Sequence, residues 1–126
     1  MHHAQLVAYG VEGRLAEVLG ELAHGRALWL REARHTKTCL NLLRQGGAGV
    51  LVLRLGKNLD QEMTLLEQVT VLFPRTRTIV VGPADNPALA GLAWDLGAAY
   101  VLFPPQPIEA LGDIVVGFLP EVQTVS

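Results

Sequence analysis

Arg54 is the charged residue whose position points most directly to a functional site. It follows the apolar run Val50–Leu53 and precedes Leu55. An unbroken apolar run is typical of a central parallel strand that is covered on both faces. In open parallel sheets, ligands and chemistry lie beyond the carboxyl ends of the strands. Arg54 is therefore expected at the edge of the sheet where a site would form.

Several roles are open for Arg54. Its guanidinium could bind an anion such as phosphate through two hydrogen bonds. It could also occupy the space and supply the positive charge of a bound cation. The structural alternative, which we favour, is a strand-end arginine that bonds nearby carbonyls or pairs with Glu12 or Asp85.

Other reactive residue types give weaker patterns. His35 and Cys39 are four residues apart, but zinc needs three or four ligands, so Cys39 is expected in the core. No catalytic triad, phosphate-binding loop or glycine-rich dinucleotide turn is present. We therefore expect no enzyme activity, no cofactor and no metal. A basic cluster surrounds the same segment and could contact an acidic partner or nucleic acid, although a solvated face is favoured: Arg31, Arg34, His35, Lys37 and Arg44.

Length and composition indicate one globular domain. The chain has 126 residues, of which 50% are hydrophobic, and a formal net charge of −2. This charge gives no general case for binding nucleic acid or membranes. A single cysteine excludes an internal disulfide and fits a reducing compartment, and no apolar run is long enough to span a membrane. We expect a cytoplasmic domain over residues 5–119, with tails at 1–4 and 120–126.

Short strands alternate with helical patterns along this domain. The strands are predicted at 5–9, 27–31, 48–54, 78–81 and 100–103, and the helices at 12–23, 36–45, 59–73, 87–96 and 107–119. Asn58 or Asp60 is expected to cap the third helix, and Asn86 before Pro87 the fourth. This alternation indicates βαβ units and an α/β fold with helices on both faces of a parallel sheet.

The predicted fourth helix carries the most informative surface. Its buried stripe is expected to hold Leu89, Leu92, Ala93 and Leu96. Trp94 falls roughly opposite that stripe, and Ala90 and Gly91 would let another chain approach closely. An outward tryptophan among small residues is typical of a protein–protein contact.

The chain resembles a response-regulator receiver domain over nearly its whole length. Four stretches carry the resemblance: Ala48–Arg54, Leu59-Asp60 with Leu65-Leu66, Pro74–Val81, and Leu96–Tyr100 with Phe103-Pro104. The resemblance implies a five-stranded parallel sheet in the flavodoxin-like order 2-1-3-4-5 between two layers of helices.

The phosphoacceptor chemistry of that family is not matched. In the family a carboxylate ends the third strand and accepts the phosphoryl group, and this position holds Arg54. Two acidic residues after the first strand bind magnesium in the family, where this chain has Tyr9, Gly10 and Val11. Magnesium requires oxygen ligands such as carboxylates, so the resemblance implies a site that does not bind it.

The remaining family positions depart as well. A Ser or Thr after the fourth strand is replaced by Gly82, and a lysine before a proline by Phe103 before Pro104, or by Pro104 before Pro105. In the family the peptide bond before that proline is often cis. The resemblance thus implies a pseudo-receiver, in which the fold is kept and the phosphorylation site is lost.

Three functions follow as hypotheses. The first is a regulatory signalling domain that acts by protein–protein contact, without phosphorylation. The second is a small-molecule or anion sensor that uses the vacated pocket around Gly10, Arg54, Gly82 and Phe103. Nucleic-acid binding through the basic cluster is the third and least favoured. We expect a twofold homodimer through the fourth helix, fifth strand and fifth helix, with an interface of Ala90, Gly91, Trp94, Tyr100 and Val116. The resemblance implies the same surface, because receivers usually dimerise there.

Overall fold

A computed structural model describes residues 5–26, 28–46 and 49–119 of the chain. The predicted tails at 1–4 and 120–126 lie outside the described residues, as do Ala27 and Ala48, with which two strands are predicted to begin. Five parallel strands form one sheet in the order β2-β1-β3-β4-β5, which confirms the predicted order. The strands are β1 (Gln5–Tyr9), β2 (Trp29–Ala33), β3 (Gly49–Arg54), β4 (Arg77–Val81) and β5 (Tyr100–Leu102).

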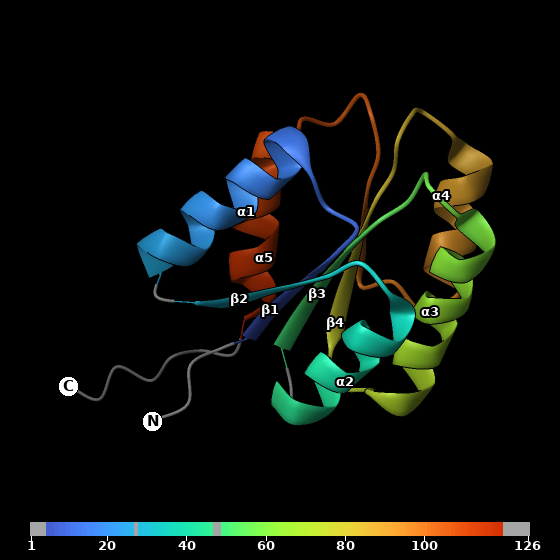
Figure 1. Ribbon diagram of the computed structural model, residues 1–126. Helices are drawn as coiled ribbons and strands as arrows, with labels where there is room; N and C mark the ends of the chain where they lie inside the picture. The colour runs from blue at the N-terminus through green and yellow to red at the C-terminus, as the bar shows by residue number, and fades with distance from the viewer. Residues whose placement is uncertain (1–4, 27, 47–48, 120–126) are drawn as a thin grey trace.

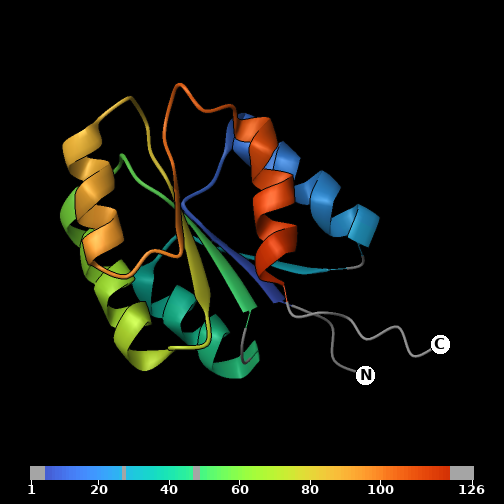
Figure 2. The same cartoon turned by 180° about the vertical axis from the view of Figure 1, so that it is seen from behind.

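Helices cover both faces of this sheet, which confirms the three-layer α/β/α prediction (Figures 1 and 2). α1 and α5 lie on one face, and α2, α3 and α4 lie on the other. Their bounds are α1 (Gly13–Arg26), α2 (Thr36–Gly46), α3 (Leu59–Leu72), α4 (Pro87–Asp95) and α5 (Leu111–Phe118), with a short 3-10 turn, η1 (Ile108–Ala110), before α5.

β3 is the central strand, as its unbroken apolar run predicts. Val50, Leu51, Val52 and Leu53 are all fully buried. Val50 and Val52 belong to the core under α1 and α5, whereas Leu51 and Leu53 belong to the core under α2, α3 and α4. Because both faces of the strand meet helices, no polar alternation is required.

The predicted caps start α3 and α4 at the carboxyl edge of the sheet. The Asn58 side chain accepts a hydrogen bond from the backbone N–H of Gln61 at 3.2 Å. The Asn86 side chain accepts one from Leu89 at 3.1 Å, and Pro87 is the first helical residue. These bonds satisfy backbone donors that a helix start leaves unpaired.

The predicted bounds of the second strand are wrong by two residues. β2 runs over Trp29–Ala33 rather than 27–31, because it pairs with β1 from Gln5↔Trp29 to Tyr9↔Ala33. The apolar residues before Trp29 led to a predicted strand start that is too early. Pairing across the sheet, rather than local hydrophobicity, sets the register of this edge strand.

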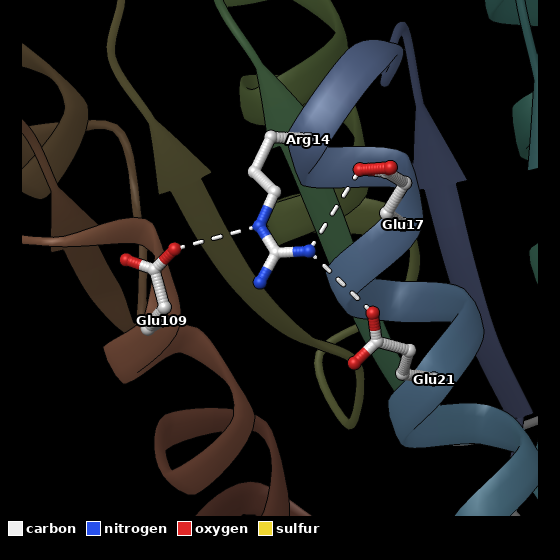
Figure 3. Close-up of polar contacts among 4 residues, drawn as sticks. All are labelled: Arg14, Glu17, Glu21 and Glu109. Atoms are coloured by element: carbon white, nitrogen blue, oxygen red, sulfur yellow. Dashed lines mark hydrogen bonds and ion pairs between the residues drawn. The ribbon is translucent and has the colours of Figure 1, made fainter.

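Arg14 links α1 to the 3-10 turn η1, which precedes α5, on one face of the sheet. Its Nε lies 3.5 Å from Glu109 Oε2, and its Nη1 lies 3.5 Å from Glu21 and 3.7 Å from Glu17 (Figure 3). All four side chains are more than half exposed. Such ion pairs contribute little to stability. One guanidinium is shared by three carboxylates, so Arg14 offsets only part of the negative charge of Glu109.

Candidate functional site at the carboxyl edge of the sheet

The predicted site residues meet at one edge of the sheet. Tyr9 ends β1 and Arg54 ends β3, and the loops that follow these strands leave the sheet at the upper edge in Figure 1. β4 is followed by Gly82, whose N–H donates to the Leu102 carbonyl at 3.0 Å. Phe103 then follows β5, so the sheet brings these separated positions together.

Phe103 fills the space above Gly82. A Cβ on Gly82 would lie 2.3 Å from a ring carbon of Phe103, and only 7% of Phe103 is exposed. A real Cβ cannot approach that closely, so glycine is required while the ring occupies this space. The Gly82–Phe103 contact therefore places an apolar ring at the position of a predicted vacated pocket.

The peptide bond between Pro104 and Pro105 is cis. This is the second of the two bonds that the resemblance leaves open. The Phe103–Pro104 bond, which is the other, is not cis.

Cationic side chains surround the exposed Glu12 carboxylate at this edge. Lys57 Nζ lies 3.2 Å from Glu12 Oε1. The hydrogen bond and charge of Lys57 hold the pKa of the Glu12 carboxyl below its usual range. The positive charges of Arg54 and Arg34 lower the pKa of Glu12 further. These three cations outnumber the exposed Glu12 carboxylate, and the buried Glu62 carboxylate beside Lys57 offsets part of their charge.

Glu62 is the site residue that the sequence analysis missed. It is only 3% exposed, and its carboxylate accepts hydrogen bonds from three consecutive backbone N–H groups. The distances are 2.9 Å from Gly56, 3.2 Å from Lys57 and 3.1 Å from Asn58. These bonds fix the loop that follows Arg54. A signal was present, because Glu62 lies on the same helical face as Leu66 and Val69.

A small cavity lies beside this loop, between the ends of β1 and β2 and the start of α3. Its volume is about 110 Å³, and its lining is polar and charged: Tyr9, Gly10, Arg34, Lys57, Asn58, Gln61 and Glu62. Burial raises the pKa of the Tyr9 hydroxyl, and the nearby Glu62 carboxylate acts in the same direction. The phenol is therefore neutral, and the charges around the cavity come from Arg34, Lys57 and Glu62.

No set of three or more His, Cys, Asp or Glu side chains is grouped to hold a metal ion within the ranges that the structure describes. Cys39 is fully buried, and burial raises the pKa of its thiol to about 12. His35 is exposed. The two residues therefore have different environments and do not form a shared site.

Solved structures with the same arrangement identify the fold. No family model matches the sequence, and no curated protein matches it. The chain is similar to a response regulator from Thermotoga maritima, with a TM-score of 0.75 and 15% identity over 91% of this chain and 97% of that one. It is also similar to the chemotaxis protein CheY4 of Vibrio cholerae, with a TM-score of 0.76 and 13% identity over 93% and 99%.

The fold is that of the response-regulator receiver domains. A third similar structure is the receiver domain of Ssk1 from Saccharomyces cerevisiae, in complex with the phosphotransfer protein Ypd1. Its TM-score is 0.71 at 11% identity, over 93% of this chain and 89% of that one. These identities are low enough that they carry the fold and not the activity.

The surface of α4 on this receiver fold differs partly from the prediction. Trp94 is 48% exposed, and its ring meets that of Tyr100 edge-on at 6.0 Å. Ala93 is fully buried, as predicted, but Leu92 was also expected in the buried stripe and is 44% exposed. A narrower stripe through Leu89, Ala93 and Leu96 fits the helical period, and the smaller side chain faces the sheet.

The other predicted interface residues lie in different environments. Gly91 is exposed. Ala90 is partly buried and packs against the core under α4, so it leaves less free surface beside Trp94 than expected. Val116 of α5 is also partly buried. Tyr100 is partly buried as well, so Trp94 and Gly91 remain the exposed part of the predicted interface.

The described residues include no helix that is both long and apolar enough to cross a membrane.

Proposed function

We propose that this chain is a pseudo-receiver, a regulatory signalling domain that acts by protein–protein contact without phosphorylation or catalysis. The observation that carries the proposal is the Gly82–Phe103 contact, in which an aromatic ring occupies space beside the end of β4. Arg54 ends β3 without an acceptor carboxylate beside it in sequence. These residues support an edge that keeps one conformation and is not phosphorylated.

The charges at the edge support the same proposal. Lys57 pairs with Glu12 and so links the loop after β3 to the loop after β1. Glu62 holds the loop after β3 through three backbone bonds. Both contacts are internal to the chain. We propose that they replace an external ligand in connecting these loops, and that no cofactor is needed.

Phosphorylation is tested by incubating the protein with acetyl phosphate and magnesium and measuring its intact mass. We expect the mass to stay unchanged. The matched variant Arg54→Asp restores an acidic side chain at the end of β3, and we expect it to stay unmodified as well. An added phosphoryl mass on the wild type, at Asp60, Asp85 or another aspartate, would overturn the proposal.

Partner contact is proposed at the surface that α4, β5 and α5 form, here called the α4–β5–α5 surface and centred on Trp94 and Tyr100. Its exposed aromatic ring and the exposed Gly91 beside it support this assignment. A second copy of the chain, in the cytoplasm, is the partner that the sequence predicts. Trp94→Glu should weaken the contact without unfolding the domain, as measured by light scattering and a thermal melt.

Anion sensing is a second candidate, supported by the cavity of about 110 Å³ that Arg34 and Lys57 line. A cavity of this size has room for a small anion or a few water molecules. A thermal-shift titration with inorganic phosphate tests it. Binding should raise the melting temperature of the wild type and not that of Lys57→Met, and no shift up to millimolar phosphate would exclude it.

A further inference from the structure

Opposite edges of the sheet carry opposite charge. Residues 22–46, which include the end of α1, all of β2 and α2, contain one acidic residue, Glu32, and five basic ones: Arg26, Arg31, Arg34, Lys37 and Arg44. Residues 78–119 contain no Lys or Arg and four acidic residues: Asp85, Asp95, Glu109 and Asp113. Because β2 and β5 are the two edge strands, a separation in sequence becomes a separation in space.

Some of these charges already have partners. Glu109 pairs with Arg14. Arg77, at the start of β4, lies over the ring of Phe118 at 5.9 Å and brings one positive charge close to α5. No ion pair within 4.0 Å is formed by Asp95 or Asp113 among the described residues, and both are exposed. The α4–β5–α5 surface therefore keeps two free carboxylates.

Each edge also exposes a tryptophan. Trp29 of β2 is 52% exposed, and the guanidinium of Arg31 lies 4.4 Å from its ring centroid. At the other edge Trp94 is 48% exposed beside Tyr100. Exposed tryptophan and arginine side chains dominate the energy of many protein interfaces. We call Trp29, Arg31 and Arg34 together the β2-edge surface.

Neither edge strand pairs with a strand on its outer side in the described part of the sheet. Among the described strands, β2 pairs only with β1 and β5 pairs only with β4. An edge strand presents unpaired backbone groups that another chain can use. Exposed tryptophan rings and backbone groups without a strand partner thus occur together at both edges.

A twofold contact at either surface brings like charges together. Two copies joined by a twofold axis present the same surface to each other. At the α4–β5–α5 surface this brings Asp95 and Asp113 toward their own copies, and at the β2 edge it brings Arg31 and Arg34 together. Like charges that face each other oppose association, whereas unlike charges favour it. A contact between the two different edges pairs basic with acidic side chains.

We propose that the β2-edge surface of one copy docks on the α4–β5–α5 surface of a second copy, in a head-to-tail arrangement. The inference rests on the proposed partner surface and names its occupant. After the first contact each copy keeps one free surface, and the pair keeps one of each kind, so association continues beyond two unless a ring closes. Salt screens the exposed charges and weakens the contact.

Two charge-reversed variants test the arrangement. The first is Arg31→Glu/Arg34→Glu, and the second is Asp95→Lys/Asp113→Lys. At low salt the wild type should gain mass in light scattering as its concentration rises through the micromolar range. Each variant alone should remain a monomer. An equimolar mixture should associate again, because each variant contributes the intact surface that the other lacks.

Controls separate charge from folding. Arg75→Glu reverses one charge at an exposed position after α3, outside both surfaces. This variant should associate like the wild type. Circular dichroism and a thermal melt establish that each variant folds. If the first variant melts early because the Arg31–Trp29 contact is lost, Arg34→Glu alone replaces it.

The outcomes distinguish this inference from the proposed function. If both charge-reversed variants associate like the wild type and Trp94→Glu does not, the contact is a twofold dimer at the α4–β5–α5 surface. The head-to-tail arrangement is then wrong and the proposed partner surface stands. A wild type that stays monomeric at low salt overturns the second copy as occupant. Association that salt does not weaken, with both charge-reversed variants and Trp94→Glu unaffected, overturns both surfaces.

Discussion

Replacing Gly82 with alanine tests whether the Phe103 ring fills the site. The added Cβ would lie 2.3, 2.4 and 2.5 Å from three ring carbons of Phe103. Ordinary contacts begin near 3.4 Å, so the ring or the backbone must move by about 1 Å. Phe103 is 7% exposed and packs in the core, which prevents a free rotation into solvent. Overpacking of this kind costs about 1–3 kcal/mol.

Urea unfolding measures this cost. With a slope of about 1–3 kcal/mol per molar urea, Gly82→Ala should lower the unfolding midpoint by on the order of 1 M at an unchanged slope. Gly91→Ala is the matched control, because its Cβ would meet nothing within 4 Å and it lies in α4. Alanine is the better helix former, so this control should raise stability by about 0.5–1 kcal/mol.

Replacing Phe103 with the smaller leucine supplies the decisive comparison. Phe103→Leu alone should destabilise the domain, because it removes buried atoms. Combined with Gly82→Ala, it should cost less than the sum of the two single changes, with a coupling of about 1 kcal/mol or more. If the two costs simply add, or if Gly82→Ala is neutral, the ring does not occupy this space and the reasoning about the filled site fails.

Three further predictions concern titratable groups. Glu62→Ala should lower the free energy of unfolding by about 2–3 kcal/mol in urea, because three backbone donors lose a charged acceptor; a loss below about 0.5 kcal/mol would contradict this. Because the pKa of Glu12 is lowered from 4.5, its stabilising contribution should be present above that pH and disappear as the pH falls through the lowered pKa. An NMR titration should show Lys57→Met returning that pKa toward 4.5, and an unchanged pKa would refute the pairing. With a thiol pKa raised to about 12, Cys39 should resist a thiol reagent at pH 8 until denaturant is added, and rapid reaction of the folded chain would argue against its burial.

Local signals were enough for most of the fold. The apolar run Val50–Leu53 needs helices on both faces, and that alone places it at the centre of a sheet. Asn86 before Pro87 supplies both a side-chain cap and a first helical residue that needs no donor. Such features depend on neighbours in sequence, so a single sequence contains the information for them.

The register of β2 and the phase of α4 could not be obtained in this way. β2 is an edge strand, and its burial depends on how far it overlaps β1 and on which helices cover it. In α4, Leu92 and Ala93 both fit the predicted stripe, and only contact with the sheet decides that Ala93 is buried and Leu92 is exposed. Both errors concern long-range packing, which local hydrophobicity does not determine.

The positions of Arg54 and Gly82 in the candidate site could be predicted from the sequence, whereas the contacts of Phe103 and Glu62 could not. Arg54 and Gly82 could be assigned from their places after apolar strands. The filling of the space by Phe103 depends on a contact between residues 21 positions apart in sequence. Glu62 could have been suspected, because an acidic residue within an apolar helical stripe must find donors when it is buried. Its donors belong to the preceding loop, which the stripe alone does not reveal.

The two contacts that hold the carboxyl edge differ in how they respond to conditions. The Lys57–Glu12 ion pair is about half exposed, so salt screens it and its contribution to stability is small. The Glu62 carboxylate is buried and bonded to backbone groups, and bulk ions screen such bonds far less. The loop after Arg54 should therefore keep its position when the exposed pair is weakened. The carboxyl edge is stabilised chiefly by the buried Glu62 bonds. A change in salt concentration should therefore affect the exposed charges at the β2 and β5 edges of the sheet more than this loop.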